Sequence, residues 1–211
     1  MTQTSKPASA LRVVKKERTR TALVNAAVDL CLRRGYDNTT IDDIARAADV
    51  SPRTLARYFT TKDAVFVAVL DDLAEAVAAE LTALPPEIGP LQAMRTALGT
   101  ILTRAGRSQF SSGERIVRTI RVVTECAALQ RAAVEYRGPQ VLAAMAHRMN
   151  VDIDDRRLEL AMTLISVTVV HAWSTLDTSA APLNPQRIKE QIDRTFDEFA
   201  SFAADLEPAA G

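Results

Sequence analysis

Apolar side chains recur at every third or fourth position along most of the chain, which is the spacing of helices that bury one face. In the first such stretch Leu23 and Leu30 fall on one face, and Gly35 suits the position just past a helix end. A later stretch, from residue 62 to about residue 84, stops at two consecutive prolines, which cannot continue a helix. This pattern predicts an all-α fold.

The second half of the chain repeats the same periodicity between breaks made by Gly, Ser and Pro. It predicts a helix over about 91–102, one that starts near 111–113, a pair over 127–149 interrupted at Gly138, and two long helices over about 154–176 and 185–206. The stretch 154–176 is apolar nearly all round. A helix of that kind must be buried on several sides.

Two short helices are expected between the first helix and the long one. Thr40 is a good N-cap residue, and Asp43, three residues on, completes something close to a capping box. The first short helix ends around Asp49. Ser51 is again an N-cap residue, and Pro52 falls at the first helical position, where its missing N–H costs nothing. The chain therefore makes a tight turn between two short, capped helices.

The second short helix has one apolar side and one open side. Leu55 and Phe59 are four residues apart and face inward, whereas Arg53, Thr54 and Arg57 fall on the other side. Arginine is the commonest specific reader of guanine, and the first residues of a recognition helix are the ones that reach base edges. This arrangement predicts a helix-turn-helix that places its second helix in the major groove of DNA.

Residues 18–70 resemble the N-terminal domain of the TetR family of bacterial transcriptional regulators. The matching features are the amphipathic helix from Arg18 to Cys31, Gly35-Tyr36, Thr39-Thr40, Asp43-Ile44-Ala45, Ala48, Val50-Ser51, Thr54-Leu55, Tyr58-Phe59, Lys62 and Val65-Phe66. One departure is Asp49, where the family usually has Gly, although Asp tolerates left-handed backbone better than most residues. Another is Ala56, where many members carry a larger side chain, which implies one fewer DNA contact.

The resemblance implies an N-terminal three-helix helix-turn-helix DNA-binding domain followed by a helical ligand-binding and dimerisation domain. We expect a disordered tail over 1–12, the DNA-binding domain over 13–62, a connecting helix over 63–84 and the effector-binding and dimerisation domain over 85–211. Charge agrees with this division, since residues 1–62 carry 12 Lys and Arg against 6 Asp and Glu, whereas the rest carries 14 against 20. A basic end on an acidic body suits a DNA footprint confined to one end.

The candidate DNA-binding residues combine the open face of the second short helix, its caps and nearby basic or phenolic groups suited to phosphate. They are Lys15, Arg18, Thr40, Ser51, Pro52, Arg53, Thr54, Arg57, Tyr58 and Lys62. The resemblance also implies a cavity for a small effector among the body helices. Its candidate lining, each member of which could equally be ordinary core, is Met94, Leu98, Phe110, Ile120, Met145, Met162 and Trp173.

The same sequence weighs against other classes of function. His147 and His171 have no evident Ser or Cys partner, and there is no Gly-rich phosphate loop, so no enzyme site is expected. Cys31 and Cys126 fall on apolar helical faces without metal-ligand spacing, which favours buried thiols and no cofactor. No stretch is long and apolar enough for a membrane span, and no signal peptide is evident, so a cytoplasmic protein is expected.

We therefore expect a DNA-binding regulator, most readily a repressor. Its partners would be a double-stranded, pseudo-palindromic DNA operator, a second copy in a homodimer, and a small apolar or amphipathic effector. An acyl-CoA-like effector is one option, because the body after Arg115 resembles actinobacterial-type regulators proposed to bind such molecules. A loose basic series could meet a phosphate-bearing ligand, although such a series is more often a solvated face with Glu114 and Glu125 nearby; it consists of Arg104, Arg107, Arg115, Arg118 and Arg121. The alternative is a helical scaffold or partner-binding protein that keeps the helix-turn-helix head but reads no DNA.

Overall fold

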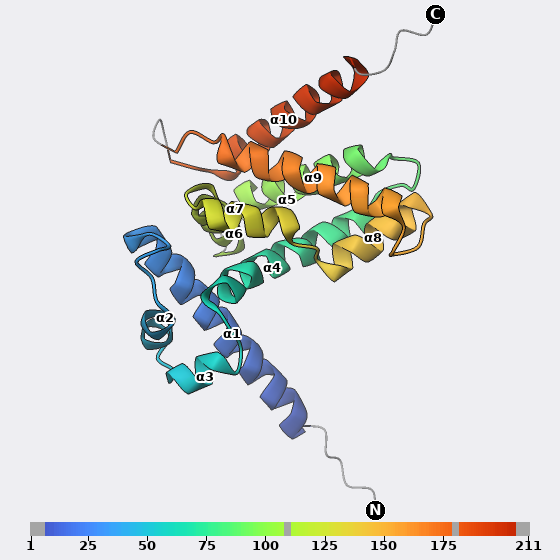
Figure 1. The fold of residues 1–211 in the computed structure, drawn as a ribbon. Coiled ribbons are helices and arrows are strands. Elements are labelled where there is room, and N and C mark those ends of the chain that lie inside the picture. Colours follow the sequence, from blue (N-terminus) through green and yellow to red (C-terminus); the bar gives the residue numbers. More distant parts are fainter. Residues whose placement is uncertain (1–6, 108–110, 179–181, 206–211) are drawn as a thin grey trace, which may run out of the picture. The chain divides into compact units, whose positions relative to one another are not determined.

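The computed structural model describes residues 7–107, 111–178 and 182–205. Across these ranges the regular structure consists of α-helices alone, which confirms the predicted all-α fold (Figure 1). The chain forms two compact units, one up to Val69 and the other from Leu70 onward. We call the first the head and the second the body.

The head is built from α1 (Pro7–Arg34), α2 (Ile41–Ala47), α3 (Pro52–Ala56) and the first turns of α4 (Lys62–Ala83). Helix α1 packs against α2, and α2 packs against α3. Each helix contributes a completely buried apolar side chain to one small core. These residues are Leu23, Ala27, Ile44, Leu55 and Val65. The short helices are too short to be stable alone, so this shared core holds them in place.

The start of α1 corrects one sequence expectation. Residues 1–12 were expected to form a disordered tail, but α1 already begins at Pro7. Proline suits the first turn of a helix because its fixed φ is helical and the N–H it lacks would have no helical acceptor there. Ala8, Ala10 and Leu11 have high helix propensity and carry the helix forward. Polarity was therefore a poor guide to disorder in residues 7–12.

The body contains the rest of α4 and six further helices among the described residues. These are α5 (Pro90–Arg107), α6 (Ser111–Thr124), α7 (Ala127–Glu135), α8 (Pro139–Met149), α9 (Arg156–Ser174) and α10 (Pro185–Asp205). Helix α9 is the central one, since it packs against α5, α6, α7, α8 and α10 (Figure 1). This agrees with the expectation that the stretch apolar nearly all round is buried on several sides.

One face of α9 nevertheless remains open. Leu160, Leu164 and Val167 are 60%, 42% and 48% exposed, and their spacing of four and three residues places them on one side of the helix. We call these three residues the α9 stripe. The helices that the structure describes do not cover this apolar side.

Helix α4 belongs to both units. The sequence suggested a separate connecting helix over 63–84 and a body that starts at residue 85, whereas the body as observed begins at Leu70. The reason is burial, because Leu70, Ala74, Val77 and Leu81 of α4 are buried in the body. One continuous helix thus starts in the head and ends in the body core.

The two cysteines differ in their surroundings. Cys31 is buried in α1, as expected. Cys126 is only half-buried, because α6 ends at Thr124 and Cys126 occupies the extended N-cap position of α7. The expectation of two buried thiols on helical faces is therefore wrong for Cys126.

The C-terminal end of α4 is capped by an arginine from α8. The two guanidinium nitrogens Nη1 and Nη2 of Arg148 donate to four backbone carbonyls, those of Leu81 at 2.6 Å, Leu84 at 3.0 Å, Pro85 at 2.7 Å and Ile88 at 2.9 Å. In a continuing helix the Leu81 carbonyl would accept from the N–H of residue 85, but proline has none. Arg148 supplies the missing donors and a positive charge at the negative end of the helix.

We expect Arg148→Met to lower the free energy of unfolding by about 2–4 kcal/mol, because it leaves helix-end carbonyls without their charged donor. Chemical denaturation followed by circular dichroism measures the loss. Arg156→Met is the matched control, since Arg156 is an exposed arginine in the first turn of α9. Equal stability of the two variants would show that the Arg148 contacts contribute nothing.

Candidate functional site

The turn between α2 and α3 is fixed by caps on both sides. The Thr40 hydroxyl accepts from the Asp43 backbone N–H at 3.2 Å, and the Asp43 carboxylate accepts from the Thr40 N–H at 3.3 Å and from its hydroxyl at 2.7 Å, which completes the predicted capping box. These hydrogen bonds from Thr40 lower the pKa of Asp43 from its ordinary value. On the α3 side, the Ser51 hydroxyl accepts from the Thr54 N–H at 3.1 Å.

Asp49 provides the left-handed residue that closes α2. Its φ is +54°, its N–H donates to the Arg46 carbonyl at 3.2 Å, and the Val50 N–H donates to the Ala45 carbonyl at 3.0 Å. This pair of hydrogen bonds is the Schellman motif that commonly ends a helix. The turn therefore forms with Asp where Gly is usual, as the sequence predicted.

The arginine side chains on the outer side of α3 make no hydrogen bonds or ion pairs with the described part of the protein. Leu55 is completely buried and Phe59 is 6% exposed, so both anchor α3 in the head core. Arg53 and Arg57 are exposed on the other side, and neither guanidinium has a hydrogen-bond or ion-pair partner among the described residues. Two unpaired guanidinium groups one turn apart can donate to base edges or phosphates without first breaking a protein contact.

The other predicted DNA-binding residues lie on or beside α3, at the start of α2, or on α1. Pro52 and Ser51 are exposed at the start of α3, Thr54 and Tyr58 are half-buried, and Thr40 is exposed at the start of α2. The Ser51 and Thr54 hydroxyls are 2.9 Å apart and hydrogen-bonded. Lys15 and Arg18 are exposed on α1.

Lys62 differs from the expectation of a side chain free to bind phosphate. Its ammonium donates to the Tyr36 backbone carbonyl at 2.9 Å and lies 3.9 Å from the centroid of the Tyr36 ring. The Tyr36 hydroxyl in turn donates to Asp63, and its ring meets Phe66 edge-on with centroids 5.1 Å apart. Lys62 therefore joins the start of α4 to the loop after α1. From the sequence, Tyr36 stood out only as part of the Gly35-Tyr36 pair, and the pattern assigned it no structural role.

We expect Lys62→Met to destabilise the head by about 1–2 kcal/mol, through loss of a charged hydrogen bond and a cation–π contact. Amide hydrogen exchange of α2 and α3 would report the change locally. Lys16→Met, at an exposed lysine of α1, is the control. If the exchange rates in Lys62→Met equalled those of the wild-type protein, the contacts of Lys62 with Tyr36 would contribute nothing to the stability of the head.

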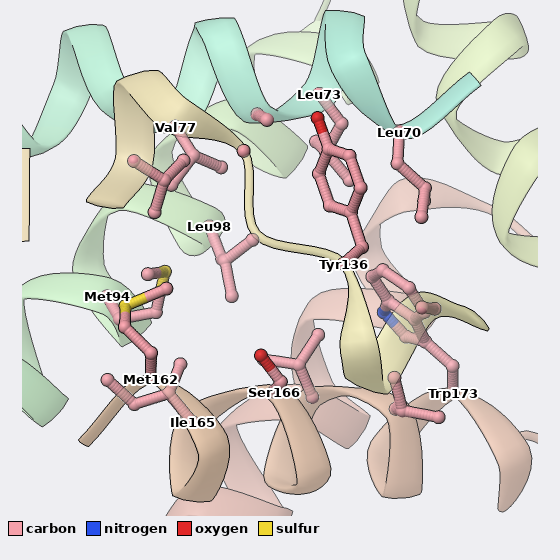
Figure 2. Close-up of a pocket in the computed structure, with 16 residues that line it drawn as sticks. Leu70, Leu73, Val77, Met94, Leu98, Tyr136, Met162, Ile165, Ser166 and Trp173 are labelled. Carbon is pink, nitrogen blue, oxygen red and sulfur yellow. The ribbon is translucent and has the colours of Figure 1, made fainter. Parts of the chain in front are cut away.

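The body contains an apolar cavity of about 100 Å³ that is open to solvent on one side (Figure 2). Its walls come from α4, α5, the α7–α8 region and α9. The lining residues are Leu70, Leu73, Ala74, Val77, Met94, Leu98, Ala133, Tyr136, Gly138, Val141, Met162, Ile165, Ser166, Val169, Val170 and Trp173.

The structure brings four of the predicted effector-site residues together on this cavity and leaves the others elsewhere. Met94 and Leu98 of α5 and Met162 and Trp173 of α9 line it. Ile120 and Met145 are fully buried but do not line it, so they are core residues in this structure. Phe110 lies outside the described residues. The sequence missed the α4 wall, Tyr136 and Ser166, since only tertiary packing brings these segments together.

No acidic or basic side chain belongs to the cavity lining as described. Two members of the basic series considered from the sequence pair with acids instead, Arg104 with Glu80 and Arg121 with Glu125 at 2.9 Å. Side-chain positions of Arg115 lie outside the described part of the structure. The cavity therefore offers apolar contacts and a few neutral polar groups.

Two features tie the cavity wall to α4. The Tyr136 hydroxyl donates to Asp71 of α4 at 2.6 Å. Gly138 lies so close to α4 that a Cβ built on it would stand 2.8 Å from the Ala74 Cβ, closer than real Cβ atoms approach one another. The α7–α8 region is therefore in direct contact with α4. Among the described helices, none combines the length and the apolar character that crossing a membrane requires.

Comparison with known proteins agrees with this anatomy. Residues 23–69 match the family model for bacterial regulatory proteins of the tetR family. The HTH-type transcriptional regulator TcmR of Streptomyces glaucescens is 34% identical over 151 residues, which span 69% of this chain and 66% of TcmR.

Solved structures share the fold along most of the chain. Thermus thermophilus FadR, a TetR-family transcriptional repressor in complex with lauroyl-CoA, aligns with a TM-score of 0.51 and 19% identity over 91% of this chain and 98% of its own. SmeT in complex with triclosan aligns with a TM-score of 0.52 and 16% identity over 86% of this chain and 91% of its own. With the helix-turn-helix head, the family model and the TcmR alignment in agreement, the chain belongs to the TetR family of DNA-binding transcriptional regulators.

Proposed function

We propose that this protein is a ligand-responsive repressor that leaves its operator when a small apolar molecule enters the body cavity. The observation that carries the proposal is the path of α4, which starts beside Tyr36 in the head and forms a wall of the cavity in the body. A single continuous helix thus contributes residues both to the unit with the DNA-reading face and to the unit with the ligand space.

The DNA-reading part of the proposal rests on α3. The free guanidinium groups of Arg53 and Arg57 would read base edges, and Lys15 and Arg18 of α1 would contact phosphates. Lys62 supports the head from within and would contribute to DNA binding through its stability. A head of this size reads only a few base pairs, so two heads on a homodimer would read two half-sites of a pseudo-palindrome.

The α9 stripe supports a homodimer. Leu160, Leu164 and Val167 present apolar surface that the chain itself leaves open, and a symmetric pairing of two copies would bury it twice over. Helix α10, which packs against α9, would complete the interface that the family resemblance implies.

The size of the cavity suggests how a ligand could act. Small-molecule sites are typically about 300–1,000 Å³, whereas this cavity is about 100 Å³. An effector of ordinary size would therefore separate the cavity walls, and Asp71 and Ala74 place α4 in their path. The ligand would bind the displaced state better than the closed one, which is the differential affinity that control requires.

Between the two effector types, the lining favours the uncharged one. FadR holds lauroyl-CoA and SmeT holds triclosan, so relatives of this fold accommodate both kinds of molecule. Here no basic side chain lines the cavity to receive the phosphates of a CoA-like group. Burying a phosphate without a cation would be costly.

The test is the linkage between ligand and operator. We expect saturation with an effector to lower operator affinity about 5- to 150-fold, and saturation with operator to lower effector affinity by the same factor. Fluorescence anisotropy of labelled operator and titration of the fluorescence of Trp173, the only tryptophan, measure the two sides of the cycle. A ligand that fills the cavity yet leaves operator affinity unchanged would refute the control mechanism and leave the family assignment intact.

The scaffold alternative predicts no operator at all. The unpaired state of Arg53 and Arg57 argues against it, because a head that no longer reads DNA has no need of two exposed guanidinium groups on the outer face of α3.

A further inference from the structure

Trp173 carries a buried hydrogen-bond donor that has no acceptor. Its side chain is 4% exposed, and its indole Nε1 has no hydrogen-bond partner in the described structure. Buried donors are almost always paired, since an unpaired one loses its hydration without replacement. Trp173 also lines the apolar cavity, and Figure 2 shows its nitrogen on the edge of the ring that faces Ser166. An acceptor within the cavity would therefore be placed to pair this donor.

The two hydroxyls of the lining do not pair with Trp173 Nε1, and each has another partner. Tyr136 uses its hydroxyl to donate to Asp71 on the α4 side at 2.6 Å. Ser166, two helical turns before Trp173 on the same face of α9, accepts from Arg137 Nη1 at 3.3 Å. No other hydroxyl, carboxylate or amide side chain belongs to the lining. Trp173 Nε1 is thus an unpaired donor in a wall that is apolar apart from these two hydroxyls.

Charge restricts the ligand further. Arg137, which bonds the lining residue Ser166, does not itself line the cavity, and its guanidinium already donates to the backbone carbonyls of Val134 and Tyr136 and to the hydroxyls of Ser166 and Thr163. An anionic ligand would enter without a free cation, and a cationic one without an acid. Both would pay the cost of burying an unpaired charge. A neutral ligand avoids that cost.

We propose that the effector is a neutral, mainly apolar compound with one carbonyl-type oxygen that accepts a hydrogen bond from Trp173 Nε1. This inference rests on the proposed function, because it specifies the ligand class of the same cavity. Met94 and Met162 would adapt to the shape of the apolar part, as flexible thioether side chains do. The oxygen would pair the donor that the protein leaves open.

The test uses the fact that Trp173 is the only tryptophan. In ¹⁵N-labelled protein the single indole N–H resonance reports this donor directly. Three probes of similar ring size are compared: cyclohexanone, methylenecyclohexane, in which a CH₂ group replaces the oxygen, and cyclohexanecarboxylate. None carries an aromatic ring current. We expect cyclohexanone to move the indole proton downfield, methylenecyclohexane to bind without that shift, and the carboxylate to bind at least about tenfold more weakly than the ketone.

Trp173→Phe removes the donor and keeps an aromatic ring. We expect this variant to lower the affinity for cyclohexanone about 5- to 10-fold more than the affinity for methylenecyclohexane. The extra space that phenylalanine leaves affects both probes, so it cancels when the two affinity changes are compared as a ratio. Because the resonance is measured in the unaltered protein, the test does not depend on this variant folding.

Each outcome decides the proposal. An indole resonance that stays in place when cyclohexanone is bound overturns it, as does carboxylate affinity equal to that of the ketone, or failure of the ketone to bind at all. Operator affinity is measured in the same samples. A downfield shift without any change in operator affinity would support the ligand class and refute the control mechanism, so the two can fail separately.

Discussion

Arg53→Ala is expected to lower affinity for the specific operator by about 1–3 kcal/mol, or roughly 5- to 150-fold, and to relax base preference at one position in each half-site. The reason is the place of Arg53 on the outer face of α3, exposed and without a partner among the described residues, where its guanidinium can donate to a base edge. Competition binding with operators altered one base pair at a time measures both effects.

Two controls separate base reading from general attraction. Lys15→Ala, on exposed α1, should weaken binding to all sequences alike and reduce the slope of log affinity against log salt by about 1. Arg107→Ala, at an exposed arginine of the body, should leave DNA binding unaltered. If Arg53→Ala weakened specific and nonspecific binding equally, this residue would contact only the DNA backbone.

Leu164→Arg is expected to convert the protein to monomers and to lower operator affinity about 100- to 10,000-fold, because the two heads would no longer be linked. Leu164 is the middle residue of the α9 stripe and is 42% exposed, so an arginine there can reach solvent in the monomer without disturbing its fold. In a dimer, two symmetry-related arginines would meet in apolar surroundings. Sedimentation velocity at micromolar concentration measures the assembly state.

The matched control is Ile153→Arg, which adds the same charge at an equally apolar, 58% exposed residue between α8 and α9, off the stripe. It should stay dimeric with unaltered operator affinity. Wild-type protein that sediments as a monomer, or a fully dimeric Leu164→Arg, would contradict an interface on the α9 stripe.

Local features of the head could be predicted from the sequence because their causes are local. The caps at Thr40 and Ser51 need only a hydroxyl and the backbone three residues on, and the structure has both hydrogen bonds. The left-handed turn at Asp49 likewise depends on one residue and its neighbours. The inward positions of Leu55 and Phe59 follow from the helical period alone.

Contacts between distant segments could not be predicted in the same way. The sequence suggested that the Lys62 ammonium is free to bind phosphate. In the structure it donates a hydrogen bond to the backbone carbonyl of Tyr36, which lies 26 positions earlier in the chain. Met145 fits an apolar lining by type but is buried away from the cavity, since periodicity says that a residue is buried and not what it faces. The place of Tyr136 in the cavity wall could not be predicted, because its hydrogen bond to Asp71 joins segments that only the folded body brings together.

The α9 stripe illustrates the same limit in reverse. The sequence marked the whole stretch over 154–176 as apolar and therefore buried, but it could not separate the side that faces its own chain from the side that the described helices leave open. The structure separates them, with Leu158 completely buried and Leu160 60% exposed.

The most direct test of the central claim, that this protein is a sequence-specific DNA-binding regulator, is selection of bound fragments from a random DNA library by the purified full chain, followed by sequencing. The expected result is one enriched motif with two inverted half-sites whose centres lie about one helical turn, or a multiple of it, apart. Loss of that enrichment at one position per half-site with Arg53→Ala would place α3 on the bases. Recovery of unenriched sequence, with every fragment bound alike, would contradict the claim.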